Sequence, residues 1–202
     1  MLIAQRKAEL RRAARKRSRS VDDGMDLAER SLSVQRRFLS AFPPRRGGRL
    51  ALYMAVAGEV GTDLIRTVCL AAGMSLFYPR VMENGSLLFY PDGGSDGWVR
   101  GKYGLLEPRV TPGMEGIRNG FDRIVVPGVA FDSMGRRLGK GFGYYDRFLS
   151  GLAGSAVTVG LAFTRQMLSE VPVDPWDVPV DAVVTEDGVI RVARDRAGVP
   201  IK

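Results

Sequence analysis

The most chemically suggestive part of this sequence is a basic segment spaced by glycines. The stretch RRLGKGFGYYDRFL, residues 136–149, has glycine at every second position from 139 to 143 and carries the cations Arg137 and Lys140. Glycine can adopt positive φ and bring the backbone close to a ligand, and successive exposed N–H groups form a nest for an anion. We therefore predict a polyphosphate-binding site here, with a purely structural turn as the alternative interpretation.

Neither of two common phosphate-binding patterns fits this segment. A P-loop requires G-x-x-x-x-G-K-[ST], whereas GRRLGKG at 135–141 has one residue too few and no hydroxyl after the lysine. The dinucleotide pattern is G-x-G-x-x-G, whereas GKGFGY at 139–144 reads G-x-G-x-G. The segment therefore predicts an anion site of a different type.

Asp146 is a candidate metal ligand beside this segment. It falls in the first turn of a predicted helix, whose N-terminus would also favour a phosphate. A carboxylate there either pairs with the helix dipole or holds Mg²⁺ against phosphate oxygens, because Mg²⁺ is commonly bound by one or two carboxylates together with phosphates. The residue types leave both interpretations open.

The positive charge of the chain is concentrated at its N-terminus. Of the formal net charge of +8, residues 1–19 supply +7, from eight Lys or Arg side chains against one Glu. Such a cluster indicates a polyanionic partner: nucleic acid, an acidic membrane or the phosphates of a small molecule. Lys7, Arg11 and Arg15 are four residues apart and so share one face of a helix. That face is either solvated or closes over the same phosphates.

The residues that are missing restrict the chemistry. The 202-residue chain contains no histidine, which excludes Ser-His-Asp and Cys-His nucleophile systems and histidine-based metal sites. The single cysteine, Cys69, cannot form an intrachain disulfide, and its apolar, helically spaced neighbours favour a core position. With no bilayer-length apolar run and no signal-peptide core, we expect a cytoplasmic protein.

The elements that must position these residues follow an alternating pattern. Two helices are predicted at 3–19 and 25–42. Further along, we expect strands at 49–57, 74–81, 85–90, 121–128 and 156–163, a strand pair in 181–192, helices at 61–73 and 144–154, and an irregular segment at 103–113. This alternation predicts an α/β fold: a mainly parallel sheet flanked by helices with Rossmann-like layering, preceded by two N-terminal helices.

The length and composition favour one domain, 1–202. Its helical N-terminal segment, 1–42, would carry the basic phosphate-binding face, and 49–192 would form the α/β core. Ligands of such sheets bind beyond the carboxyl ends of the strands. The basic loop follows the strand predicted around 123–126, so its position suits a ligand site.

A longer run of residues resembles a known family. VVPGVAFDSMGRRLGKGFGYYDRFL, residues 125–149, is similar to the signature of 5-formyltetrahydrofolate cyclo-ligases, also called 5,10-methenyltetrahydrofolate synthetases. Similar segments recur in order at 7–11 (KAELR), 53–65 (YMAVAGEVGTDLI), 78–81 (YPRV), 104–108 (GLLEP) and 171–186 (VPVDPWDVPVDAVVTE). In the last segment Trp176 precedes Asp177 where many members have His-Asp.

The resemblance implies ATP- and Mg²⁺-dependent conversion of 5-formyltetrahydrofolate to 5,10-methenyltetrahydrofolate. ATP phosphorylates the formyl oxygen, N10 attacks the activated carbon, and phosphate leaves as the ring closes. The implied ATP contacts are Lys7, Arg11, Arg137, Leu138, Gly139, Lys140, Gly141, Phe142, Gly143, Tyr144 and Tyr145. The implied folate contacts are Met54, Glu59, Lys140, Gly141, Phe142, Gly143 and Tyr144. Asp146 and Asp177 are the implied Mg²⁺ ligands, and Lys140 and Arg137 the implied catalytic residues.

The residue types agree with such a reaction. Phosphoryl transfer to an amide-like oxygen needs charge neutralisation and alignment, which Arg, Lys, Mg²⁺ and backbone amides supply without histidine. Glu59 could accept hydrogen bonds from a pterin, although a carboxylate near a helix start is the simpler interpretation. We expect a monomer whose partners are small molecules, without nucleic acid or membrane. The rival hypotheses are a nucleic-acid-binding protein that uses the helix at 3–19 and a non-catalytic nucleotide- or folate-binding paralogue.

Overall fold

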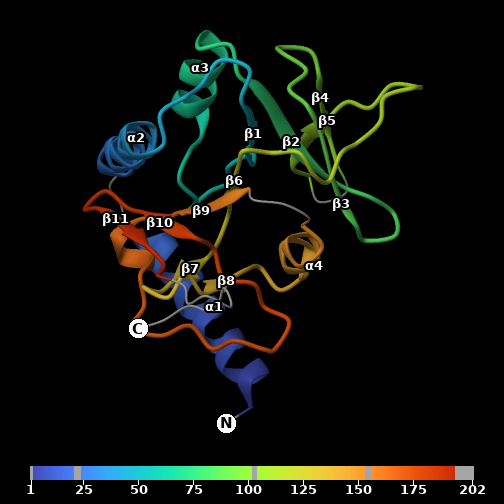
Figure 1. Ribbon diagram of the computed structural model, residues 1–202. Coiled ribbons are helices and arrows are strands. Elements are labelled where there is room, and N and C mark those ends of the chain that lie inside the picture. The colour runs from blue at the N-terminus through green and yellow to red at the C-terminus, as the bar shows by residue number, and fades with distance from the viewer. Residues whose placement is uncertain (1, 21–23, 102–103, 153–155, 194–202) are drawn as a thin grey trace.

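The computed structural model describes residues 2–20, 24–101, 104–152 and 156–193, without the side chains of 15–20 and 24–26 (Figure 1). Its centre is a seven-stranded sheet in the order β11-β10-β9-β6-β1-β2-β3. These strands are β1 (Arg49–Ala51), β2 (Ser75–Val81), β3 (Leu87–Pro91), β6 (Arg123–Val126), β9 (Val157–Leu161), β10 (Ala182–Val184) and β11 (Val189–Arg191). Neighbours from β10 to β2 pair in parallel, and only the edge strands β3 and β11 of this sheet are antiparallel. The predicted mainly parallel sheet is confirmed.

Helices lie on both faces of this sheet, as the predicted layering requires. The helices are α1 (Ile3–Ser20), α2 (Gly24–Ala41), α3 (Asp63–Ala71) and α4 (Tyr144–Ser150), with a 3₁₀ turn η1 (Thr164–Gln166). Helices α2 and α3 cover one face and α4 the other, while α1 lies on the α4 side beside the hairpin of β7 (Ala130–Phe131) and β8 (Arg137–Leu138) (Figure 1). The two N-terminal helices are therefore confirmed, although Arg15, the third cation of the predicted stripe, has its side chain outside the described part.

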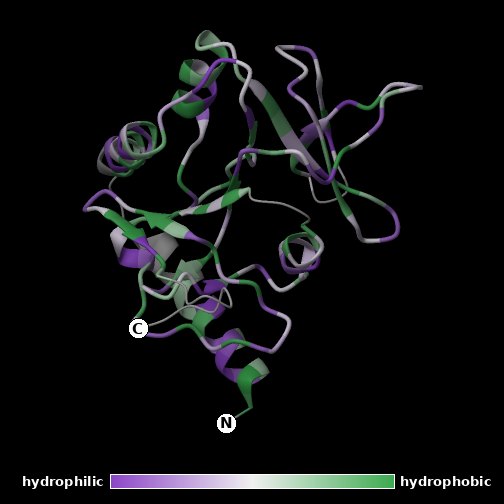
Figure 2. Cartoon of the chain, in the orientation of Figure 1, coloured by the Kyte–Doolittle hydropathy of each residue, from purple (hydrophilic) through white to green (hydrophobic). Residues whose placement is uncertain are grey.

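The strands are apolar on both sides because both sides are covered. Leu50 and Val125 pack toward α2 and α3, whereas Ala51 and Ile124 pack toward α4. Side chains alternate between the faces of a strand, so a doubly covered sheet needs the continuous hydrophobic runs seen in this sequence. Figure 2 shows this contrast between the hydrophobic sheet strands and α1, which is largely hydrophilic. Cys69 of α3 is buried in the first of these cores, as predicted.

Three local predictions were wrong. Strand β1 ends at Ala51 instead of residue 57, because the chain then turns into a loop closed by bonds from the Tyr53 hydroxyl to the Val60 carbonyl (2.7 Å) and from the Thr62 hydroxyl to the Tyr53 carbonyl (3.0 Å). Helix α4 ends at Ser150, and 153–154 of its predicted extension lie outside the described residues. The segment expected to be irregular contains β5 (Leu106–Pro108), which pairs with β4 (Trp98–Arg100). Strand β5 is too short to show an alternation of apolar and polar side chains, so its sequence does not predict that it pairs with another strand.

The sheet order brings two loops to one edge. Strands β1 and β6 are parallel neighbours, with Ala51 opposite Ile124. The loops that follow them, 52–62 and 127–136, therefore leave the sheet at the same side, and the second runs through β8 into the glycine-spaced segment. This is the edge at which open α/β sheets bind ligands.

Candidate active site

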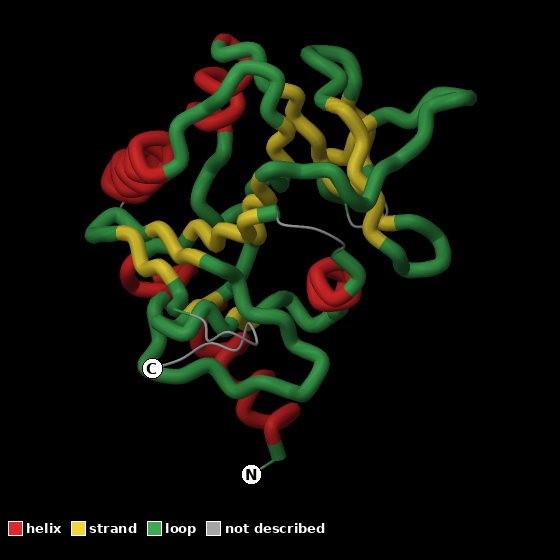
Figure 3. Tube along the Cα trace, in the orientation of Figure 1, coloured by secondary structure: helices red, strands yellow, loops and turns green. Residues whose placement is uncertain are grey.

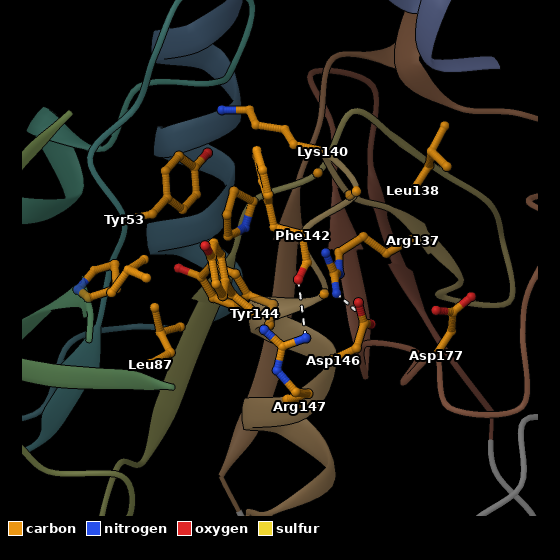
Figure 4. A pocket seen from close by; sticks show the side chains of 18 of the residues that line it. Tyr53, Leu87, Arg137, Leu138, Lys140, Phe142, Tyr144, Asp146, Arg147 and Asp177 are labelled. Atoms are coloured by element: carbon orange, nitrogen blue, oxygen red, sulfur yellow. Dashed lines mark hydrogen bonds and ion pairs between the residues drawn. The ribbon is translucent and has the colours of Figure 1, made fainter. Parts of the chain in front are cut away.

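A pocket of about 650 Å³ opens at this edge of the sheet (Figure 4). Its wall is formed by α1, the loop after β1, the segment from β8 into α4, and the segment around 174–177. Every residue that the sequence assigned to nucleotide, folate or metal lines it: Lys7, Arg11, Met54, Glu59, Arg137, Leu138, Gly139, Lys140, Gly141, Phe142, Gly143, Tyr144, Tyr145, Asp146 and Asp177. Segments more than 160 residues apart in the chain thus meet in one cavity.

Two of the three alternate glycines are required by the backbone. Gly141 has φ +108° and Gly143 has φ +67°, a region that side chains disfavour. Gly143 immediately precedes α4 and sets the direction in which that helix leaves the loop. Gly139 has no positive φ, and a Cβ there would lie 2.9 Å from an Arg137 nitrogen. Its small size therefore leaves room for the guanidinium.

Arg137 projects from β8 into the wall of the pocket, where only 4 % of its side chain is exposed. Its Nη2 donates to Asp146 Oδ1 over 2.7 Å (Figure 4). The same oxygen also accepts the N–H of Val178 at 3.4 Å, which ties α4 to the segment after Asp177. The Nε of Arg137 is buried and has no hydrogen-bond partner within the described residues. A buried donor without a partner is costly, so this side of the guanidinium is not fully satisfied by the protein.

Lys7 joins α1 to two aspartates that are distant from it in the sequence. Its Nζ lies 2.6 Å from Asp174 Oδ2 and also bonds Asp177 Oδ2, and the Asp174 N–H donates to Asp177 Oδ2 over 2.8 Å. Burial acts to lower the pKa of Lys7, but the hydrogen bonds and charges of the two aspartates outweigh it and raise the pKa. Sequence reasoning missed Asp174; its spacing of three residues before Asp177 is the only signal that pointed to it.

Arg11 anchors the next turn of α1 to the glycine-spaced loop. Its Nε donates to the Gly139 carbonyl over 2.8 Å, and the preceding residue, Leu10, packs against Leu138 and Val171. Lys7 and Arg11 thus share the face that meets the pocket, and the interpretation of these two as a purely solvated stripe was wrong.

The opposite end of the pocket holds an ion pair between Lys140 and Glu59. Lys140 Nζ lies 2.9 Å from Glu59 Oε1, and the other carboxylate oxygen of Glu59 accepts the Val56 N–H at 3.2 Å. Helix α3 begins only at Asp63, so Glu59 belongs to the loop after β1 and its interpretation as a helix-start carboxylate was wrong. Met54 lines the pocket from the same loop.

The pocket geometry can now be compared with known proteins. The sequence model of the "5-formyltetrahydrofolate cyclo-ligase family" matches residues 3–186, most of the chain. This chain belongs to that family. Its relatives include a probable 5-formyltetrahydrofolate cyclo-ligase of Caenorhabditis elegans, 31 % identical over 70 % of this chain and 74 % of the relative. The Escherichia coli 5-formyltetrahydrofolate cyclo-ligase is 31 % identical over 69 % and 79 % of the two chains.

Solved structures agree with this assignment. The 5,10-methenyltetrahydrofolate synthetase of Aquifex aeolicus superposes with a TM-score of 0.79 at 32 % identity, over 94 % of both chains. The Mycoplasma pneumoniae synthetase, at 21 % identity and a TM-score of 0.72, covers 89 % of this chain and 98 % of its own and shares the fold. Across the helices that the structure describes, none is long and apolar enough to span a membrane.

The two neighbouring tyrosines of the pocket have different surroundings. Tyr144 stacks on Phe142, with ring centroids 5.6 Å apart and planes 16° apart, and the Arg147 guanidinium lies 5.4 Å from its ring (Figure 4). The hydroxyl of Tyr145 is buried, without a hydrogen-bond partner in the described part, and burial raises the pKa of Tyr145 well above its ordinary value. Tyr144 therefore presents a flat face to the cavity, and Tyr145 presents a neutral hydroxyl at physiological pH.

The two implied Mg²⁺ ligands reach the pocket from different elements. Asp146 and Asp177 both line it, each paired with a cation. Within the described ranges no group of three or more Asp, Glu, Cys or His side chains could hold a metal ion. Two carboxylates beside a cationic cradle fit an ion that arrives with phosphates, because Mg²⁺ takes few protein ligands and keeps phosphate oxygens and waters.

Proposed function

We propose that this chain catalyses the ATP- and Mg²⁺-dependent conversion of 5-formyltetrahydrofolate to 5,10-methenyltetrahydrofolate, releasing ADP and phosphate. The observation that carries the proposal is a pocket with two kinds of end: at one, here called the cationic end, Lys7, Arg11 and Arg137 stand beside Asp146 and Asp177, and at the other Lys140 pairs with Glu59. Membership of the cyclo-ligase family and the likeness to a methenyltetrahydrofolate synthetase support it.

The cationic end would bind the triphosphate. Lys7, Arg11 and Arg137 all line the cavity, and the Arg137 Nε is unpartnered within the described residues. Carboxylates beside Lys7 and Arg137 and the Gly139 carbonyl beside Arg11 would keep these charges in place before the nucleotide binds. Bound Mg²⁺, held by Asp146 and Asp177, would neutralise phosphate charge. With that charge neutralised, the exchange of partners from carboxylate to phosphate costs little.

Lys140 would act at the junction of the two substrates. It stands on the loop between Gly139 and Gly141, which belongs to the cationic end, while its Nζ reaches Glu59 at the other end. A cation at that place stabilises the charge that develops on the transferring phosphoryl group and on the formyl oxygen. Glu59, released from Lys140, would accept N–H groups of the pterin ring.

The reaction balances without a histidine base. The formyl oxygen attacks the γ-phosphorus and the bond to the β-phosphate oxygen breaks, which leaves ADP. The N10 lone pair then attacks the activated formyl carbon, the N10 proton passes to an oxygen of the phosphoryl group, and the C–O bond breaks as hydrogen phosphate leaves and the C=N⁺ bond forms. The protein's contribution is alignment and charge stabilisation, which the backbone amides of 139–143, Arg137 and Lys140 are placed to supply.

A direct assay tests this proposal. Purified protein is mixed with 5-formyltetrahydrofolate, ATP and Mg²⁺, and the near-ultraviolet absorbance of 5,10-methenyltetrahydrofolate is followed together with ADP release. We expect product only when all three components are present. Folded protein that makes no product under these conditions would contradict the proposal.

The finer statements about partners stay predictions. We expect a monomer that acts in the cytoplasm and does not bind nucleic acid. Lys7 and Arg11, which a nucleic-acid site would use, are engaged with Asp174, Asp177 and Gly139 in the pocket wall. A salt series with duplex DNA and RNA tests the rival, because nucleic-acid binding through clustered cations weakens steeply with salt.

A further inference from the structure

A large aromatic side chain at the mouth of the pocket has no role in the mechanism proposed above. Trp176 is 68 % exposed and lines the pocket, next in the chain to Asp177, which pairs with Lys7 of α1. Among the described residues its indole has no ring contact and no hydrogen bond. The other tryptophan, Trp98, donates its Nε1–H to the Gly94 carbonyl over 2.7 Å and packs edge-on against Tyr78 at 4.8 Å. Trp98 has a structural role, whereas packing does not account for Trp176.

The backbone that carries Trp176 is nevertheless held in place. It occupies the third position of a turn from Asp174 to Asp177, in which the Asp177 N–H donates to the Asp174 carbonyl over 3.0 Å. Pro175 at the second position restricts φ and stiffens the turn. Lys7 binds the carboxylates at both ends of the turn. Figure 3 shows this segment as part of the long loop between η1 and β10 that extends toward α1.

The positions of the charged side chains in the pocket indicate which flat part of a ligand can reach the Trp176 indole. The turn that carries Trp176 also carries Asp177, beside Lys7 at the cationic end. Tyr53 and Leu87 lie on the other side of the cavity in Figure 4, with Arg137 and Asp146 between them and Asp177. A polyphosphate held by the cations would therefore separate Trp176 from the pterin. The part of the ligand near Trp176 is then the one attached to the end of the polyphosphate that lies farthest from the pterin.

We propose that Trp176 stacks on the base of the nucleotide and sets the affinity of this site for a nucleoside triphosphate over a bare polyphosphate. This inference rests on the proposed function. An indole offers a wide π-face and loses little conformational entropy on binding, because it has two rotatable bonds and stands on a rigid turn. Stacking of a base on an aromatic side chain depends on ring area, so phenylalanine should substitute in part and alanine should not.

The test compares ligands with and without a base. Dissociation constants are measured by titration calorimetry for ATP, inorganic tripolyphosphate and 5-formyltetrahydrofolate, each with Mg²⁺. We expect Trp176→Ala to weaken ATP binding by roughly 5- to 150-fold and to leave tripolyphosphate and folate unchanged. Trp176→Phe should fall between alanine and wild type. Val173→Ala is the matched control, because Val173 is an exposed apolar residue of the same loop that does not line the pocket.

A fluorescence measurement supplies a second readout. In a Trp98→Phe background Trp176 is the one remaining tryptophan, since the chain has two. Its emission should change with ATP and not with tripolyphosphate. An unchanged ATP affinity in Trp176→Ala would overturn the stacking, and so would equal losses for ATP and tripolyphosphate or a loss confined to folate. Failure of the proposed function appears separately, as absence of turnover in the wild-type protein.

Discussion

Asp146→Asn tests whether the Arg137 guanidinium depends on a negative charge inside the pocket wall. The two groups meet at 2.7 Å, with 4 % of the Arg137 side chain and 17 % of the Asp146 side chain exposed. Asparagine keeps the size of the side chain and an oxygen that can accept the Val178 N–H, which Asp146 accepts at 3.4 Å. The substitution therefore removes the charge and little else.

The expected loss follows from the burial of the pair. Removing one partner of a buried ion pair costs about 3–5 kcal/mol, because the other charge stays desolvated without compensation. Here the amide oxygen can still accept a hydrogen bond from Arg137, and Asp146 is partly exposed. We therefore expect a loss of about 2 kcal/mol in the free energy of unfolding. For a chain of this length that corresponds to a melting temperature lowered by roughly 4–8 °C.

Thermal denaturation followed by circular dichroism, without nucleotide, measures this loss. Glu170→Gln is the matched control, because its pair with Arg136 (3.0 Å) is also Arg–carboxylate but 61 % of the Glu170 side chain is exposed. Such a pair contributes about 0–1 kcal/mol. Equal melting temperatures for the two variants would refute the reasoning from burial.

The same variant separates two roles of Asp146. If the carboxylate also binds Mg²⁺, Asp146→Asn should require a higher Mg²⁺ concentration for half-maximal turnover. An unchanged Mg²⁺ titration together with a lower melting temperature would leave Asp146 as the partner of Arg137 alone.

Three further predictions concern single side chains. Lys140→Ala should reduce turnover at least about a hundredfold, with little change in melting temperature because 44 % of its side chain is exposed; near-normal kcat would remove Lys140 from the mechanism. The raised pKa of Lys7 means that its pairing with Asp174 and Asp177 stabilises the fold fully below the unfolded pKa of 10.5 and is lost as the pH rises through the folded value. Unfolding by urea across an alkaline pH series should therefore show a steeper decline in the free energy of unfolding for wild type than for Lys7→Met, since the buried tyrosines contribute a decline to both, and parallel curves would contradict the pairing. Burial raises the pKa of the Cys69 thiol to about 11, so iodoacetamide should modify Cys69 slowly in the native protein and readily in urea, whereas equal rates would show that the thiol is accessible.

The sequence determined the parts of this protein that depend on neighbouring residues. Apolar runs and turn residues predict most strands and helices, because hydrophobic periodicity and glycine conformations are local properties. The glycine-spaced loop and the cations Arg137 and Lys140 lie within one short segment. The family resemblance added Met54, Glu59 and Asp177, whose types alone would not have assigned them to this site.

Only the tertiary structure decided which distant groups meet. Lys7 is 167 residues from Asp174, and the pairing arises because α1 packs beside the β7–β8 hairpin while the loop before β10 extends toward it. Likewise, Glu59 meets Lys140 because β1 and β6 are neighbours in the sheet, an order that no single strand specifies. The end of β1 at Ala51 and the difference between Tyr144 and Tyr145 depend on what packs around them. Such contacts between distant segments depend on the complete fold, so local residue patterns do not predict them.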